Sequence, residues 1–559
     1  MKNGIYILRH VIKKLQKPKI SANFLMPLLR CSRKLPTLFV TASRSDERML
    51  SSSHDPTMRR AHVLAFFCLA VKGCLLPEEL DGGSPDIHRR YLTESSNMPI
   101  GRGDRFARGE LPAGIGQSPR ASFDSILNVE EVDSALTSLA MAYPDQLRKS
   151  KFWLKTFENR SIVSVQMGTR PRVFLVSGLH ARERGGPDIL IYFISDLLWA
   201  TSAGRGLSYE GRHYSPEQVR TAASAGIIST PLVNPDGVAY DQKTDSCWRK
   251  NRNTAQRFND SSDPSIWSKS VGVDLNRNFA TMFDYRRLFS PESSVFNITS
   301  DQPDQPVYKG PEAESETETK SLMHVLRTVK SLSWYLDLHS FGGHVLYSWG
   351  HDMAQTRDPR QSFTNRAYDG RRGMVEDGYG EFMEEDQLAG QIDLSKRMVQ
   401  AMNKAGGITN YSSMESAWLP AQGLDAKKGY PAWGSTDEAM ARYYGKHCGA
   451  NRISGLTVEF GSRSDARCPF YPDAAMYRGN LGQTAAGLME MLLIAAGERS
   501  GPKMYRDATC CRLNLEDLMN RIDAWWVDGP DWLGYSPQPW RPTAWGVLGA
   551  GRQNRERPR

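Results

Sequence analysis

The sequence predicts an α/β fold, because short apolar segments typical of strands alternate with amphipathic segments typical of helices. This patterning starts near Phe123 and fades after Glu498. Hydrophobic residues make up 40% and charged residues 24% of the 559 residues, which is typical of a globular protein that can bury a sizeable core. We therefore expect one large domain with less structured flanks.

The elements of this domain are expected in the following order. A first helix is expected over residues 129–143. Four apolar runs bounded by turn residues are expected to be strands: 173–177, 227–233, 333–338 and 455–460. The helices expected after these strands cover residues 187–200, 311–329, 394–404 and 481–496.

Side chains suited to a metal ion follow two of the expected strands. His180 and Glu183 come directly after strand 173–177, and His339 ends the apolar run 334–338. Ligands of α/β sheets bind beyond the carboxyl ends of the strands. Catalytic zinc typically takes three protein ligands, two histidines and a glutamate being one known set, and leaves a fourth position for water. A lone His-x-x-Glu pair is more often structural than catalytic. The prediction of a zinc site therefore depends on His339 as the third ligand.

Three more motifs follow the loop at residues 180–183. They are Asn-Pro-Asp-Gly at 234–237 with Trp-Arg-Lys-Asn-Arg at 248–252, Gly-Val-Asp-Leu-Asn-Arg-Asn-Phe at 272–279, and the strand at 455–460. In this order the four motifs resemble those of zinc metallocarboxypeptidases of the carboxypeptidase A and B type, over residues 123–497. The resemblance implies a single catalytic domain with a mixed, mostly parallel, twisted sheet flanked by helices.

The resemblance also implies the roles of the metal-binding and catalytic residues. His180, Glu183 and His339 are expected to bind one Zn²⁺ per domain, and Glu459 is expected to be the general base. Elementary chemistry agrees with this assignment, because zinc lowers the pKa of its bound water to about 7. A nearby carboxylate can then take the proton and pass it to the leaving amine.

Substrate contacts follow from the same resemblance. Arg249 is expected to stabilise the oxyanion, and Asn276 and Arg277 to bind the terminal carboxylate, which a planar guanidinium fits with two hydrogen bonds. Tyr430 is expected near that carboxylate. Thr436 falls where the family sets side-chain preference, and its neutral side chain favours apolar or aromatic C-terminal residues.

The sequence departs from the family pattern in three places. The spacing after Tyr430 is one residue shorter than in the pancreatic enzymes, so Tyr443 and Tyr444 are alternatives. A charged insertion near 352–386 could cap the entrance and restrict substrates. Residues 75–122 are rich in Gly, Pro, Ser and Arg, and we expect a disordered linker or short propeptide there, in place of a folded inhibitory prodomain.

Several other polar side chains near the motifs are predicted to be uninvolved. His344, His351 and His447 lack a carboxylate at ligand spacing and are expected in loops or on the surface. Lys250 and Arg252 are expected to belong to a solvated basic loop.

The expected function is therefore zinc-dependent removal of C-terminal residues from peptides and proteins by a monomer. Two alternatives are a zinc amidohydrolase of the same fold that acts on another amide, and an inactive relative that only binds peptides. Retention of Glu459 and Arg249 disfavours the inactive relative. Many of the bases behind the net charge of +9 lie in the termini, so no nucleic acid partner is expected. The sequence shows no stretch typical of a transmembrane helix, so an integral membrane location is not expected either.

Targeting segments are expected before the domain. Residues 58–74 resemble a secretory signal peptide, so translation is expected to start at Met58 and residues 1–57 to be a non-native or targeting leader. Secretion is the expected location. Mitochondria are the alternative, if residues 1–45 are a transit peptide.

Two features after the leader remain. A disulfide is expected between Cys448 and Cys468, which bracket one expected strand. Residues 498–559 form a Trp-rich extension, for which a docking element and a partner-binding segment are both open interpretations.

Overall fold

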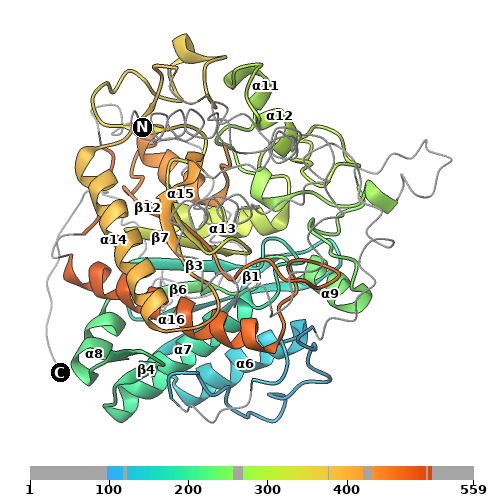
Figure 1. Cartoon of the computed structure of the whole chain (residues 1–559), viewed down its shortest axis with the longest axis vertical. Helices are drawn as coiled ribbons and strands as arrows, with labels where there is room; N and C mark the ends of the chain where they lie inside the picture. The colour runs from blue at the N-terminus through green and yellow to red at the C-terminus, as the bar shows by residue number, and fades with distance from the viewer. Residues whose placement is uncertain are drawn as a thin grey trace, which may run out of the picture. The chain divides into compact units, whose positions relative to one another are not determined.

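The computed structural model describes residues 97–117, 123–255, 268–374, 377–418, 431–498 and 501–506. A mixed eight-stranded sheet with helices on both faces forms the centre of this part of the chain (Figure 1). The four central strands run parallel to one another, and antiparallel pairings occur toward both edges. This architecture confirms the predicted fold class.

The strands include all four that were predicted from apolar runs. In spatial order they are β1 (Leu147–Lys155), β2 (Ser161–Met167), β6 (Ile227–Thr230), β3 (Val173–Ser177), β7 (Trp334–His339), β12 (Ser454–Glu459), β8 (His344–Tyr347) and β11 (Ser412–Glu415). Two small pairs lie apart from the sheet: β4 (Leu207–Tyr209) with β5 (Arg212–Tyr214), and β9 (Ala354–Gln355) with β10 (Glu381–Phe382).

Alternate residues of β3 belong to two different hydrophobic clusters, because successive side chains of a strand point to opposite faces. Val173 and Leu175 pack in one cluster, and Phe174 and Val176 pack in the other. The helices that contribute to the first cluster are α6 (Val129–Ala142), α7 (Gly186–Ala203), α8 (Pro216–Ser224), α9 (Pro235–Thr244), α14 (Glu385–Lys404) and α16 (Ala474–Gly497). Those that contribute to the second are α13 (Thr317–Thr328) and α15 (Ser435–Tyr444).

Short helical turns complete the described structure. They are η3 (Leu275–Arg277), α11 (Tyr285–Leu288), α12 (Val295–Ile298), η4 (Arg366–Tyr368) and η5 (Ser416–Trp418). In the part of the chain that the structure describes, no helix is both long and apolar enough to cross a membrane.

The segment 97–117 is ordered against the domain, so the expectation of disorder is wrong for these residues. The backbone N–H of Gly116 donates to the buried carboxylate of Asp196 on α7, at 2.9 Å to Oδ2. Arg105 forms an ion pair with the buried Glu131 of α6. Pairing with buried carboxylates holds this segment in place despite its lack of hydrophobic periodicity.

The expected Cys448–Cys468 disulfide is wrong. Cys468 pairs with Cys247, across 221 residues of sequence, because the loop before Trp248 and the loop after β12 meet within one buried cluster. Cys448 is itself disulfide-bonded, so its partner is neither of these two.

Several predictions fall outside the described residues. They concern the leader (1–57), the signal-like segment (58–74), Tyr430 and all but the start of the Trp-rich extension.

Candidate metal centre and active site

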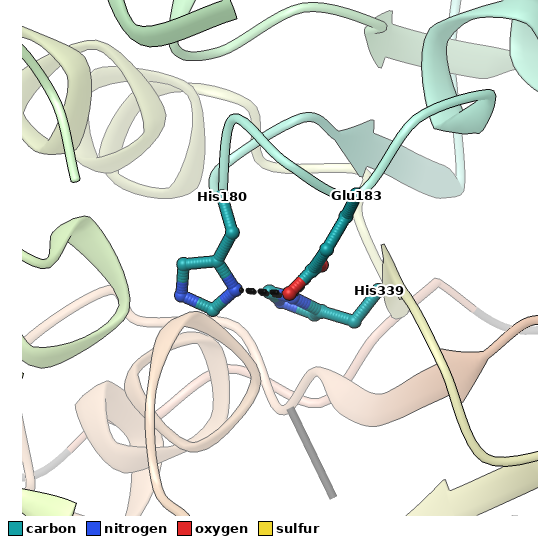
Figure 2. Close-up of side chains that lie close together, drawn as sticks. All are labelled: His180, Glu183 and His339. Carbon is teal, nitrogen blue, oxygen red and sulfur yellow. Dashed lines mark hydrogen bonds and ion pairs between the residues drawn. The ribbon is translucent and has the colours of Figure 1, made fainter. Parts of the chain in front are cut away.

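The three expected metal ligands lie together at the carboxyl ends of adjacent parallel strands. His180 and Glu183 lie in the loop after β3, and His339 is the last residue of β7, which pairs with β3. Figure 2 shows the two imidazole rings facing the carboxylate. His180 Nδ1 is 2.7 Å from Glu183 Oε1, and His339 Nδ1 is 2.9 Å from Glu183 Oε2. Candidate ligand atoms of all three lie within 4.8 Å of one another.

Two aspartates fix the orientation of the rings. His180 Nε2 lies 3.1 Å from Asp274 Oδ1, and His339 Nε2 lies 2.9 Å from Asp337 Oδ2. A carboxylate on the outer nitrogen of a histidine holds that nitrogen protonated and leaves the inner one available to a metal. Two Nδ1 atoms and one carboxylate form a donor set that suits zinc.

Both carboxylates around His180 are held ionised. Burial raises the pKa of Glu183, but His180 and His339 more than offset this and bring it well below its ordinary value. Burial also raises the pKa of Asp274, whereas Arg249 and His180 lower it, with a net shift far downward. The site therefore presents the anionic groups that metal binding requires.

Glu459 lies beside this centre on the next strand. It ends β12, and in the parallel pairing of β12 with β7 its register partner is His339. Its side chain is buried and lines a pocket beside this centre. The pocket lining also includes most of the other predicted site residues: His180, Arg249, Asn276, Arg277, His339 and Thr436.

Arg249 is fixed by Asp274, the same carboxylate that contacts His180. Its Nε and Nη2 each donate to Asp274 Oδ2 at 3.0 Å. The backbone N–H of Ala181 donates to the Arg249 carbonyl at 3.1 Å. One buried aspartate therefore aligns a metal ligand and a guanidinium with each other.

Asn276 and Arg277 lie in the short turn η3, which Asp274 caps by accepting from the Asn276 N–H. Arg277 Nε donates to the Ile298 carbonyl at 2.7 Å, and its Nη1 donates to the Trp433 carbonyl at 3.2 Å. These carbonyls orient the guanidinium without carrying charge. The cation therefore faces the pocket in a defined position.

The first turn of α15 forms another part of the pocket lining. Thr436 Oγ1 lies 2.8 Å from Thr457 Oγ1, so the two hydroxyls satisfy each other. Tyr443 and Tyr444, the alternatives to Tyr430, lie at the other end of α15. Their hydroxyls donate to side chains at the start of α14, and neither residue belongs to the pocket lining.

The chain is similar to known zinc carboxypeptidases in sequence. The family model described as zinc carboxypeptidase matches residues 132–443. The chain belongs to the zinc carboxypeptidase family. It is 26% identical to carboxypeptidase A4 of Mus musculus over 253 residues, which cover 44% of this chain and 52% of that protein. It is 29% identical to carboxypeptidase B of Helicoverpa zea over 240 residues, covering 41% and 48%. The chain thus spans about half the length of these relatives.

Solved structures of zinc carboxypeptidases and related proteins also match. The crystal structure of thrombin activatable fibrinolysis inhibitor has a TM-score of 0.48 and 18% identity, and covers 68% of this chain and 77% of its own. Carboxypeptidase A from Helicoverpa armigera has a TM-score of 0.48 and 22% identity, with coverage of 68% and 76%.

Sequence reasoning missed Asp337 and gave no role to Asp274, although both contact zinc-ligand candidates of this family member. Asp337 precedes His339 by two residues on β7. The period of two along a strand places both side chains on the same face, which is a signal that could have found it.

Two of the predictions for polar side chains near the motifs are wrong. His344 is buried in β8, and Lys250 is buried, with its Nζ donating to the carbonyls of Lys269 and Pro303. His351 lies in a loop, as predicted, but is buried. Burial lowers the pKa of Lys250 to about 7. The burial of Lys250 gave no sequence signal, because its partners are backbone carbonyls distant in sequence.

Proposed function

We propose that this protein is a zinc-dependent metallocarboxypeptidase that hydrolyses the C-terminal peptide bond of peptides and proteins. The observation that carries the proposal is one buried pocket lined by two candidate zinc ligands, a carboxylate on the adjacent strand and a fixed arginine. A metal-binding set beside a carboxylate supports hydrolysis, and a cation facing the same pocket supports recognition of a free carboxylate.

His180, Glu183 and His339 would hold the zinc. Bound there, zinc supplies Lewis-acid chemistry that polarises the scissile carbonyl and acidifies a water molecule. Asp274 and Asp337 keep the two rings aligned during this chemistry. The chain's own residues perform the remaining steps.

Glu459 would accept the proton from the attacking water and return it to the leaving amine. Its position opposite His339 in the strand register supports this role. Arg249 would donate to the oxygen on which negative charge develops, since Asp274 already holds its guanidinium at the pocket. A prepositioned donor of this kind stabilises charge without reorganisation during the reaction.

Arg277 and Asn276 would bind the substrate's terminal carboxylate. The Arg277 guanidinium is held by backbone carbonyls, and Asn276 is fixed by accepting from the Ser435 N–H at 2.9 Å. Tyr430 would approach the same carboxylate. This arrangement makes the activity exopeptidic, because a chain without a free carboxylate leaves the buried cation without its ligand.

Thr436 would contact the side chain of the residue to be released. Its hydroxyl is already bonded to Thr457, and Leu346 and Ala432 add apolar lining. These contacts support a preference for apolar or aromatic C-terminal residues.

Secretion is part of the proposal. The buried Cys247–Cys468 disulfide supports it, because structural disulfides persist in oxidising compartments. Expression of the full chain in eukaryotic cells should place the protein in the medium. Retention of the protein in mitochondria would contradict this part.

The test is release of free amino acids from blocked dipeptides that end in Phe, Leu, Lys or Arg, with and without a zinc chelator. Chelator-sensitive release of Phe or Leu is the expected result. Release of Lys or Arg alone would contradict the preference for apolar or aromatic residues and leave the carboxypeptidase activity in place. No release by protein that holds one zinc per chain would contradict the proposal as a whole.

A further inference from the structure

His351 lies at the junction between β8 and the insertion at 352–386, and it is fully buried. Its Nε2 lies 3.1 Å from Glu381 Oε2 on β10, inside the insertion. Its Nδ1 lies 3.9 Å from Asp437 Oδ2 on α15, which is beyond hydrogen-bond length but close enough for a strong interaction between charges. The ring thus connects the insertion to α15.

Asp437 belongs to the pocket lining, next to Thr436. Both of its carboxylate oxygens accept from the Gly350 N–H, at 3.0 and 3.2 Å. A Cβ at position 350 would lie 2.7 Å from Asp437 Oδ2 and 2.4 Å from the Ala432 carbonyl oxygen, so only glycine permits this approach. The backbone before His351 therefore holds the carboxylate in place.

Two carboxylates, those of Glu381 and Asp437, flank the His351 ring. Glu381 also lies near Arg372, whose Nε is 3.9 Å from Glu381 Oε2 and whose Nη1 is 3.2 Å from Asp369 Oδ1. Burial raises the pKa of Asp352 well above its ordinary value. Burial lowers the pKa of His351, but Asp437 and Glu381 raise it to about 9 overall. The histidine is therefore charged at neutral pH.

We propose that His351 is a specificity-determining residue. Its charged ring pairs with Asp437 in the lining of the substrate pocket, and Glu381 of the insertion holds the ring there. Asp437 therefore presents no uncompensated negative charge to the released residue, and neutral C-terminal side chains are preferred over basic ones. This inference rests on the proposed carboxypeptidase function and assigns part of its selectivity to the insertion.

The mechanism of discrimination is electrostatic. A Lys or Arg side chain that enters the pocket meets a carboxylate already neutralised by a cation, so its own desolvation is not compensated. Removal of the His351 charge leaves Asp437 available to a basic side chain. The insertion then contributes to selectivity without touching the substrate.

The test compares kcat/KM for blocked dipeptides ending in Lys and in Phe, using the full chain and its variants at pH 7.5. His351→Gln should raise the Lys-to-Phe ratio by about tenfold or more. The double variant His351→Gln with Asp437→Asn should bring the ratio back to within about threefold of wild type. Asp352→Asn is the matched control, because it changes a buried carboxyl next to His351 in sequence that accepts from the backbone N–H groups of Met353 and Gly373, and it should leave the ratio within about threefold.

An unchanged ratio in His351→Gln, or the same rise in the double variant or in Asp352→Asn, would overturn the proposal. If His351→Gln does not fold, Asp437→Asn alone tests the role of His351 in selectivity. That variant removes the carboxylate on the pocket side of His351 and leaves only Glu381 on the other side. It should therefore lower the Lys-to-Phe ratio and raise hydrolysis of a dipeptide ending in Glu by about tenfold; no such change overturns the inference.

The wild-type protein separates the two claims. If it hydrolyses none of the dipeptides, the proposed function fails and the inference fails with it. If it hydrolyses the Phe substrate while the variants show no shift in ratio, the inference alone fails.

Discussion

The metal centre and the lining of the substrate pocket around α15 are stabilised by different parts of the chain. At the metal centre, His180 and His339 are held by Asp274 and Asp337, which lie in or next to the family motifs. In the pocket lining, Asp437 is held by Gly350 and faces His351, where the insertion begins.

Because different parts of the chain stabilise the two regions, catalytic turnover and substrate preference can change independently of each other. The metal centre depends on strand ends that must meet in any molecule with this sheet. The α15 region depends on a segment that lies outside the sheet. This segment contacts α15 through buried charged side chains. Changes at the metal centre should therefore reduce turnover for every substrate alike, whereas changes around His351 should alter the order of preference.

The largest effect is expected for Glu459→Gln. Loss of a positioned general base typically costs about 10²–10⁴ in turnover, and the same factor should apply to Phe and Lys substrates. The measurement is kcat on both dipeptides with zinc content determined in parallel. A loss of turnover confined to one substrate would contradict the distinction between the two regions, because Glu459 would then determine substrate preference.

Arg249→Gln should have the next largest effect. Removal of one prepositioned donor to a developing oxyanion costs about 10²–10³ in kcat, whereas KM should change little. Steady-state kinetics on the Phe dipeptide measure both. A large rise in KM with unchanged kcat would assign Arg249 to binding of the ground state.

Asp274→Asn should weaken zinc binding. Substitution of a residue that orients a metal-bound histidine typically costs about 10–100-fold in metal affinity. Competition with a chromophoric chelator measures the affinity. Asp236→Asn is the matched control, since Asp236 is equally buried but accepts from Thr156 and Arg160, away from the metal centre. Equal losses in the two variants would show a general effect of burying an amide.

The smallest effect is expected for the pH dependence of the free energy of unfolding, and it involves Asp196 of α7, outside both regions. Burial raises the pKa of Asp196 from 3.8 to about 7, so the folded state favours the protonated form. The stability that depends on this proton is fully present below the unfolded pKa and is lost as the pH rises through about 7.

Asp196→Asn should remove this dependence. Between pH 5 and pH 8 the wild type should lose roughly 1–3 kcal/mol more in its free energy of unfolding than the variant. Urea denaturation at the two pH values checks this. An equal loss in both proteins would show that Asp196 does not titrate in this range.

The sequence was sufficient for the central strands and for the cluster of candidate metal ligands, because both depend on local signals. β3, β7 and β12 are short apolar runs, and His180, Glu183 and His339 end or follow two of them. The parallel sheet then brings these ends together at one edge.

Other elements were missed where polar residues are buried. α14 begins at Glu385, nine residues before the predicted start at Leu394, and Gln387 and Gln391 take buried positions in its first turns. β1 was missed because Arg and Lys residues fill most of its first half. Periodicity of apolar residues cannot identify positions whose burial is stabilised by hydrogen bonds.

Contacts between residues far apart in the sequence could not be predicted from the sequence either. The Cys247–Cys468 disulfide and the His351–Asp437 interaction join residues far apart in the chain. Sequence spacing contains no information on which loops meet at the edge of the sheet. Such contacts therefore required the folded structure.

The most direct test of the central claim uses one peptide in two forms, with a free C-terminal carboxylate and with a C-terminal amide, incubated with zinc-loaded protein and followed by mass spectrometry. Removal of single residues from the acid and none from the amide is the result predicted by a fixed Arg277 beside the metal centre. Equal cleavage of the two forms, or internal cleavage of either, would contradict an exopeptidase.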